Sequence, residues 1–136
     1  MCKIDKLKLL ISRYLEFMAM IQALFKMKTD STNPLLDWRQ KKLPQTGKIG
    51  NFEYAFHGMG VSLEEGDFDA DIEFGNEGAF GYFDAWRLIC FARNYEEFSE
   101  LNNQEEISLL LTQLKVAGYI KRDQDCWTDE LYRVCD

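Results

Sequence analysis

The segment DFDADIEF, residues 67–74, alternates strictly between acidic and apolar side chains. Successive side chains of a β-strand point to opposite faces, so this alternation predicts a strand with one apolar and one acidic face. The apolar face, which we expect to pack on a core, consists of Phe68, Ala70, Ile72 and Phe74. The acidic face, which we expect to point into water, consists of Asp67, Asp69, Asp71 and Glu73.

Two earlier segments show the same period of two. They are FEYAFHG, which starts at residue 52, and VSLEE, residues 61–65, and HGMG connects them. Three antiparallel strands in a meander are therefore predicted. We add Glu64 and Glu65, which end the second segment, to the candidate acidic surface, and we place His57 at its rim.

Helical spacing dominates the two ends of the chain. The first 28 residues carry apolar side chains spaced by threes and fours, which predicts a long amphipathic helix. FDAWRLICFARNY is also helical in pattern, with Asp84 near its start, and we expect its core residues beneath the sheet to be Phe83, Trp86 and Leu88. QEEISLLLTQLKVAG predicts a helix capped by Asn103 and closed by Gly118.

The remaining segments complete the predicted order of elements. YIKRD and LYRVC read as two strands of a terminal hairpin. Between the long helix and the meander, Asn33 and Pro34 predict the start of a short helix that Pro44 and Gly47 end, and we interpret this segment as a connector.

Length and composition indicate one domain that folds unaided. The chain has 136 residues, of which 46% are hydrophobic and 14% aromatic. A chain of this size buries well over half of its unfolded surface. We therefore expect a single α+β domain over residues 1–136. In it, a long N-terminal helix and later helices pack on a small antiparallel β-meander, and a C-terminal helix is followed by a β-hairpin.

The charge of the chain is unevenly distributed. Residues 1–50 contain ten Lys/Arg and four Asp/Glu, whereas residues 51–136 contain six and nineteen. No lysine or arginine occurs between Lys48 and Arg87, a stretch that contains nine carboxylates. Such a stretch repels nucleic acid and attracts a cationic partner, which predicts a basic protein and no nucleic acid as the partner.

The cysteines and the hydropathy indicate a cytoplasmic protein without a membrane span. The four cysteines include no CxxC pair, and the chain begins without a signal-peptide pattern. We expect free thiols, although Cys126 and Cys135 are placed to face each other across a hairpin. No apolar run approaches the roughly 20 residues needed to cross a bilayer.

Metal and cofactor sites are not predicted. If Asp67, Asp69 and Asp71 were the first ligands of an EF-hand loop, its sixth and twelfth positions would be Ile72 and Gly78 instead of glycine and glutamate. The glycine-containing segments do not match a phosphate-binding loop. We expect no metal and no cofactor.

Catalysis is the weaker interpretation of the polar residues. Carboxylate catalysis needs two groups in unlike environments, whereas a row on one strand face gives its members similar solvation. The alternative that stays open is an enzyme in which His57, the only histidine, acts with Glu53 or Asp84. We expect no enzymatic activity.

A helix followed by a glycine and a hairpin is also the pattern at the end of a winged helix. The helix that would read DNA, QEEISLLLTQLKVAG, has one base against two acids, which disfavours nucleic-acid binding. A regulatory module using this helix and hairpin remains a second alternative.

The segments YAFHGMGVSLE, residues 54–64, and DADIEFGNEGAFGYFDAWRLICFA, residues 69–92, carry a family resemblance. Residues 51–93 resemble small uncharacterised bacterial domains with a Phe-His-Gly-x-Gly strand end and a Gly-Phe-Asp-Ala-Trp-Arg-Leu core. The chain departs from that pattern at Glu73 and Tyr82. Such domains are similar to the immunity members of bacterial toxin systems. The resemblance implies a protein that binds and neutralises a toxin domain, and it carries over no catalytic residue.

Overall fold

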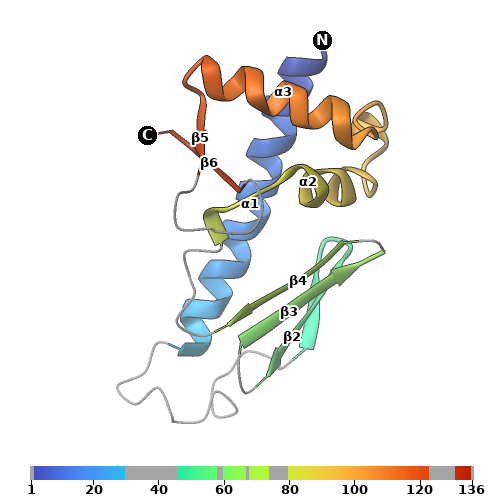
Figure 1. The fold of residues 1–136 in the computed structure, drawn as a ribbon. Coiled ribbons are helices and arrows are strands. Elements are labelled where there is room, and N and C mark those ends of the chain that lie inside the picture. The colour runs from blue at the N-terminus through green and yellow to red at the C-terminus, as the bar shows by residue number, and fades with distance from the viewer. Residues whose placement is uncertain are drawn as a thin grey trace. The chain divides into compact units, whose positions relative to one another are not determined.

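The computed structural model describes residues 2–29, 46–57, 60–66, 68–73, 80–122 and 131–135, and for residues 25–29 it describes the backbone alone. The elements are α1 (Lys3–Thr29), β1 (Thr46–Ile49), β2 (Phe52–His57), β3 (Gly60–Glu65), β4 (Phe68–Glu73), α2 (Ala85–Ala92), η3 (Glu96–Phe98), α3 (Gln104–Val116), β5 (Ile120–Arg122) and β6 (Tyr132–Val134). The predicted α+β class is confirmed (Figure 1).

The contacts within the chain divide it into two compact units. One consists of Met1–Leu15 and Gly81–Asp136, and the other of Glu16–Phe80. We call them the helical unit and the sheet unit. Helix α1 contributes its first half to the helical unit and its second half to the sheet unit. That the chain behaves as a single domain stays a prediction.

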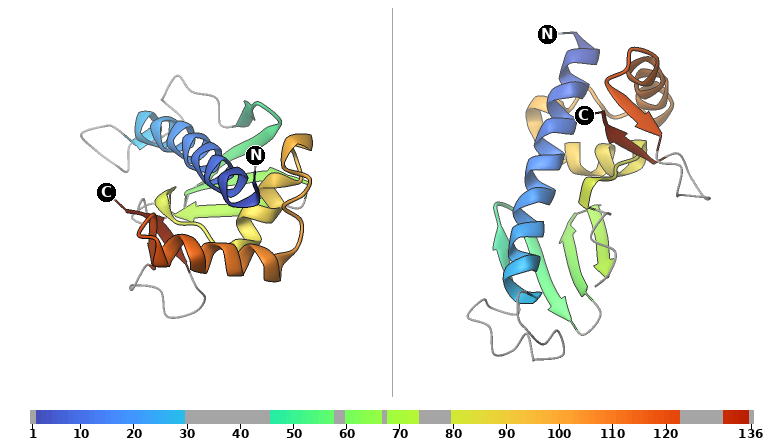
Figure 2. Two further views of the ribbon diagram at one scale, coloured as in Figure 1. Left: turned by 90° about the horizontal axis from the view of Figure 1, so that it is seen from above. Right: turned by 90° about the vertical axis from the view of Figure 1, so that its left-hand side faces the viewer.

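The sheet unit contains a four-stranded antiparallel meander in the order β1-β2-β3-β4. The second half of α1 lies along one face of this sheet (Figure 2). Strand β1 was not predicted, because residues 46–49 were assigned to the connector. It has four residues and includes a glycine, so it is too short to show a period of two. The short helix predicted from Asn33 lies outside the described residues.

Aromatic side chains form the core between the sheet and α1. The ring of Phe17 on α1 lies 4.3 Å from that of Phe52 and 6.4 Å from that of Phe68. Phe52 and Phe68 meet edge to face at 5.4 Å, a favourable arrangement for two aromatic rings. The predicted apolar face of β4 is confirmed for Phe68 and Ile72, which are both buried. Phe74 lies outside the described residues.

The helical unit is built on two capped helices. The Asp84 side chain accepts a hydrogen bond from the Arg87 backbone N–H at 2.7 Å, and that of Asn103 accepts one from Glu106 N–H at 3.0 Å. The predicted cap at Asn103 is therefore confirmed, Asp84 caps α2 in the same way, and each bond satisfies an N–H group that the helix leaves unpaired. Gly118 ends α3 with a φ of 82°, a conformation that favours glycine.

The predicted hairpin of β5 and β6 is confirmed and is joined to α2 through Phe83. Phe83 and Tyr132 exchange backbone hydrogen bonds of 3.1 and 2.8 Å, and their rings are 6.3 Å apart. Phe83 and Leu88 are fully buried within the helical unit, and their expected position beneath the sheet stays a prediction. Trp86 is not buried, because its side chain is 49% exposed and the Arg93 guanidinium lies 5.3 Å from its ring centroid. The eight-residue α2 buries the opposite side, so the expected packing of Trp86 is wrong.

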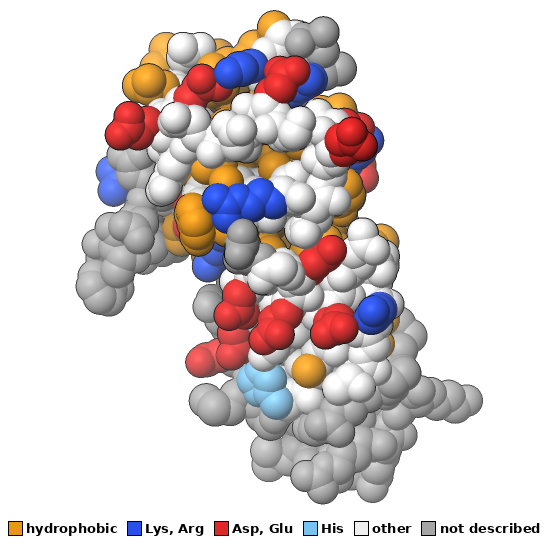
Figure 3. All heavy atoms as spheres, turned by 90° about the vertical axis from the view of Figure 1, so that its right-hand side faces the viewer, with side chains coloured by type: hydrophobic (Ala, Val, Ile, Leu, Met, Phe, Trp, Pro, Cys, Tyr) orange, Lys and Arg blue, Asp and Glu red, His pale blue; other side chains and the backbone are white. Residues whose placement is uncertain are grey.

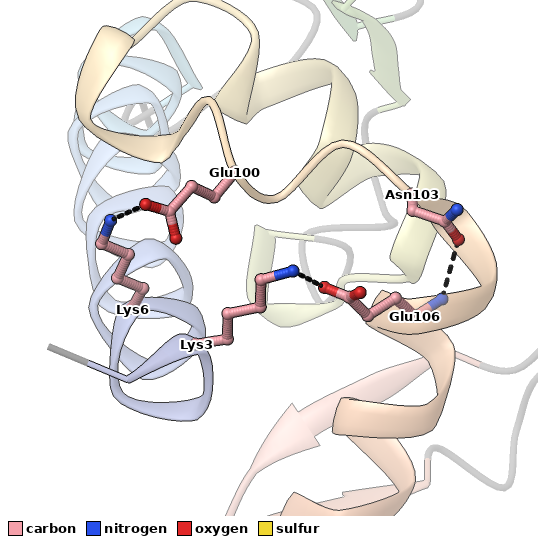
Figure 4. A network of polar contacts seen from close by, with 5 residues as sticks. All are labelled: Lys3, Lys6, Glu100, Asn103 and Glu106. Atoms are coloured by element: carbon pink, nitrogen blue, oxygen red, sulfur yellow. Dashed lines mark hydrogen bonds and ion pairs between the residues drawn. The ribbon is translucent and has the colours of Figure 1, made fainter.

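Ion pairs connect the first half of α1 to the residues around α3 (Figure 4). Lys3 pairs with Glu106 at 2.6 Å and Lys6 with Glu100 at 3.1 Å, and Arg13 pairs with Glu97. Exposed pairs of this kind contribute about 0–1 kcal/mol each. These pairs balance charge within the helical unit, because Lys3, Lys6 and Arg13 each lie beside a carboxylate of the same unit.

Candidate functional site

The outer face of the sheet, opposite the aromatic core, carries carboxylates on three strands. In the strand register, Glu53 lies directly across from Glu64, and Glu64 directly across from Asp69. All three are exposed. We call them the carboxylate row. Directly opposite residues have their Cβ atoms about 4.5–5.5 Å apart, so three negative charges lie side by side.

Two more carboxylates extend this surface along β4. Asp71 and Glu73 are exposed and point to the same face as Asp69, because side chains alternate along a strand. His57 is also on this face, and its Nε2 atom lies 3.1 Å from Asp71 Oδ1. Figure 3 shows the pale-blue His57 beside a group of red acidic side chains. We call Glu53, Glu64, Asp69, Asp71 and Glu73 the outer acidic face.

Among the described residues, one lysine meets this surface. The ammonium of Lys48 on β1 lies 3.8 Å from a carboxylate oxygen of Glu53, and the two side chains are 69% and 66% exposed. A pair this exposed contributes little to stability. In contrast to the helical unit, the sheet unit therefore leaves most of its outer charge unbalanced within the described residues.

The carboxylate row does not stabilise the sheet. Like charges directly opposite each other in an antiparallel pair are destabilising, by about 0.2–1 kcal/mol per pair. Solubility alone would be served equally well by mixed charges. Neither folding stability nor solubility therefore explains this arrangement of charges.

Two hollows lie against the carboxylate row. The first has a volume of about 410 Å³ and is lined by β1, β2 and β3, including Lys48 and Ser62. The second has a volume of about 470 Å³ and is lined by residues near the β3–β4 turn, including Asp69. Glu53 and Glu64 line both hollows. Each hollow is large enough to take a lysine or arginine side chain of a partner.

Glu65 belongs to the opposite face of the sheet. It pairs with Phe68, one position along from the carboxylate row, and its Oε2 atom is buried without a hydrogen-bond partner among the described residues. Burial raises the pKa of the Glu65 carboxyl above its usual value of 4.5, and the nearby Lys48 opposes the shift. An ionised carboxylate in this position is therefore unfavourable for folding.

We expect Glu65→Gln to raise the free energy of unfolding at pH 7. A carboxyl whose pKa is raised in the folded state does not lower the free energy of unfolding when the pH is well below its usual pKa. It lowers that free energy by the full amount when the pH is above its folded-state pKa. The stabilisation by Glu65→Gln should therefore largely disappear at pH 4. Urea denaturation of the variant and the wild type at both pH values measures this difference. A gain of equal size at pH 4 and pH 7 would show that the carboxylate charge is not its cause.

The sequence predicted most of this surface. Glu64, Asp69, Asp71, Glu73 and His57 lie together on the outer face. Glu65 points away from it, and Asp67 lies outside the described residues. Glu53 and Lys48 were not predicted on this surface, because their neighbours depend on the pairing of β2 with β3 and of β1 with β2.

The structure also shows where the residues of the enzyme alternative lie. Glu53 lies four residues from His57 on one strand, about 13 Å along the chain at the usual rise per residue. The carboxylate that contacts His57 is instead Asp71. Asp84 is engaged as the cap of α2. Within the described parts of the chain, no group of three His, Cys, Asp or Glu residues is arranged to hold a metal ion.

The described cysteines are free thiols. Cys90 is buried, Cys2 is exposed and Cys135 is partly exposed. The pairing considered for Cys126 lies outside the described residues. None of the described helices combines the length and the apolar character that crossing a bilayer requires.

Comparison with known proteins identifies the family of the chain. Searches of curated proteins and of solved structures returned no significant match. Residues 7–134 match a family described as a domain of unknown function, DUF6896. The match runs from the first half of α1 to the end of β6 and includes all four strands of the meander. The chain is therefore a member of the DUF6896 family.

Proposed function

We propose that the protein binds a basic protein partner through the outer acidic face of its sheet. The observation that carries this proposal is the carboxylate row, in which Glu53, Glu64 and Asp69 lie side by side on three strands. A charged face on a rigid sheet attracts an oppositely charged partner over a distance and accelerates association. The hollows beside the row add places for basic side chains.

The narrower proposal is that the partner is a toxin domain and that the protein is its immunity protein in the cytoplasm. It rests on the resemblance of residues 51–93 to small bacterial domains similar to immunity proteins. Neutralisation by binding needs no catalytic residue and no cofactor. An acidic face also suits a toxin that acts on nucleic acid, because such a toxin has a basic surface.

We expect the double variant Asp69→Lys/Asp71→Lys to lose the partner. Both side chains are exposed on β4, so the fold should be retained. Affinity should fall about 100-fold, on the order of tenfold for each reversed charge. The tagged wild type and variant are recovered from native cells, and mass spectrometry identifies the proteins that co-purify with each.

The matched control is Glu96→Lys/Glu105→Lys, which changes the net charge by the same amount in the helical unit. Both residues are exposed. This control should keep the partner, and circular dichroism should show that both double variants are folded. Retention of the same basic partner by the Asp69→Lys/Asp71→Lys protein would rule out the outer acidic face as the binding surface.

A second candidate is an enzyme that uses His57. The contact between His57 and Asp71 supports it, since a carboxylate can orient a histidine that acts as a general base. His57→Ala separates the two functions. A binding protein should keep its partner and its protective effect in cells within a few-fold, whereas an enzyme should keep the partner and lose the effect.

A further inference from the structure

Strand β4 is one edge of the sheet. Its single strand neighbour is β3, and no described residue pairs with its other side. Figure 1 shows β2, β3 and β4 next to one another in that order. An edge strand presents a row of backbone N–H and C=O groups to which another strand can pair.

Apart from its carboxylates, this edge lacks the usual protection against pairing. Strand β4 has six residues that pair one to one with β3, without a bulge, and it contains no proline, lysine or glycine. The opposite edge, β1, is shorter and carries Gly47 and Lys48. Natural sheets usually block their edges with lysine, proline, bulges or very short strands. Strand β4 is thus the more open of the two edges.

The outward backbone groups of β4 belong to its acidic residues. Two residues join β3 to β4, so the pair Glu65↔Phe68 closes a two-residue hairpin and is a hydrogen-bonded pair. Hydrogen-bonded and non-hydrogen-bonded pairs alternate along an antiparallel ladder. The backbone groups of Asp69, Asp71 and Glu73 therefore face away from β3, and each of these residues also carries an exposed carboxylate.

Outward backbone groups and exposed carboxylates on the same residues restrict which kind of strand can pair with β4. A second copy of β4 in antiparallel register would set Asp71 against Asp71 and Asp69 against Glu73, and like charges directly opposite are destabilising. A strand with lysine or arginine at every second position would instead set each base beside a carboxylate. Its alternate residues would continue the apolar face of Phe68 and Ile72, so they should be apolar.

We propose that β4 binds its partner by strand addition, and that the added strand carries lysine or arginine at every second position. This inference rests on the proposed binding of a basic protein and specifies how that binding occurs. Backbone hydrogen bonds to β4 supply one part of the affinity, and charge pairs on the outer face supply the other.

Two synthetic peptides test the inference on the intact protein. One alternates four lysines with four valines, and the other has the same composition with its lysines and valines in two blocks. We expect the alternating peptide to bind at least tenfold more tightly in fluorescence anisotropy. It should also slow amide hydrogen exchange at Asp69, Asp71 and Glu73 by at least tenfold, because strand addition covers these N–H groups.

A pair of variants separates backbone from side-chain contributions. Asp71→Ala and Asp71→Pro both remove the carboxylate, but only proline removes the outward N–H group, which an edge strand tolerates. We expect Asp71→Pro to bind the alternating peptide at least fivefold more weakly than Asp71→Ala does. Circular dichroism checks that both are folded, and if Asp71→Pro is not, the exchange measurement on the wild type decides.

The outcomes distinguish this inference from the proposed function. Equal binding of the two peptides without protection of the three amides would overturn strand addition and leave the acidic face as a charge-based binding surface. A wild type that dimerises through β4 in sedimentation would overturn the inference in favour of a second copy. Failure of both peptides to bind would also overturn it, and the co-purification experiment would still test the proposed function.

Discussion

Replacing Phe52 with alanine is expected to lower the free energy of unfolding by about 3–5 kcal/mol. The Phe52 side chain is 2% exposed and lies between Phe17 of α1 and Phe68 of β4. Its removal takes apolar surface out of the core and leaves a cavity that the neighbouring rings on α1 and β4 cannot easily fill. Urea denaturation followed by circular dichroism measures the change.

The matched control is Trp86→Ala, which removes a larger aromatic side chain from a site that is 49% exposed. It should lower stability by about 1 kcal/mol or less, through loss of the contact with Arg93 and of partial burial. Similar losses for the two variants would contradict the packing described for Phe52, or would mean that Trp86 is buried in solution.

Introducing a methyl group at Gly60 is expected to lower stability by about 3 kcal/mol. A Cβ atom at Gly60 would lie 2.0 Å from the carbonyl oxygen of Ile72 and 2.7 Å from the Cα atom of Glu73. Both atoms belong to the backbone of β4, so the strand itself must move. Gly60→Ala should therefore disrupt the pairing of β3 with β4 locally, which amide hydrogen exchange along β4 can detect.

Gly118→Ala is the control for the Gly60 experiment. Nothing lies within 4 Å of the position that its Cβ atom would take, but φ is 82°, so the change strains the backbone without a collision. Such strain costs about 1–2 kcal/mol. A smaller effect at Gly60 than at Gly118 would mean that the strands are less closely packed at this point. The Gly60→Ala variant should also bind the partner more weakly, because the expected movement of β4 displaces Asp71 and Glu73.

The sequence determined the types of element in most of the chain, because backbone geometry acts locally. The alternation in residues 67–74 requires a strand with two unlike faces, and Asp69, Asp71 and Glu73 are on the exposed one. Helix caps are equally local, since Asp84 and Asn103 bond to N–H groups three residues ahead.

Strand pairing and packing were decided only by the tertiary structure. Glu53, Glu64 and Asp69 form a row because three strands pair in one particular register, and no local pattern specifies register. Strand β1 is too short to show a period, so Lys48 and its position beside Glu53 could not be predicted. The exposure of Trp86 could not be predicted, because hydrophobicity alone does not show which side of a short helix will be covered. The sequence therefore predicted which charges point outward, and the pairing of the strands decided which of them lie together.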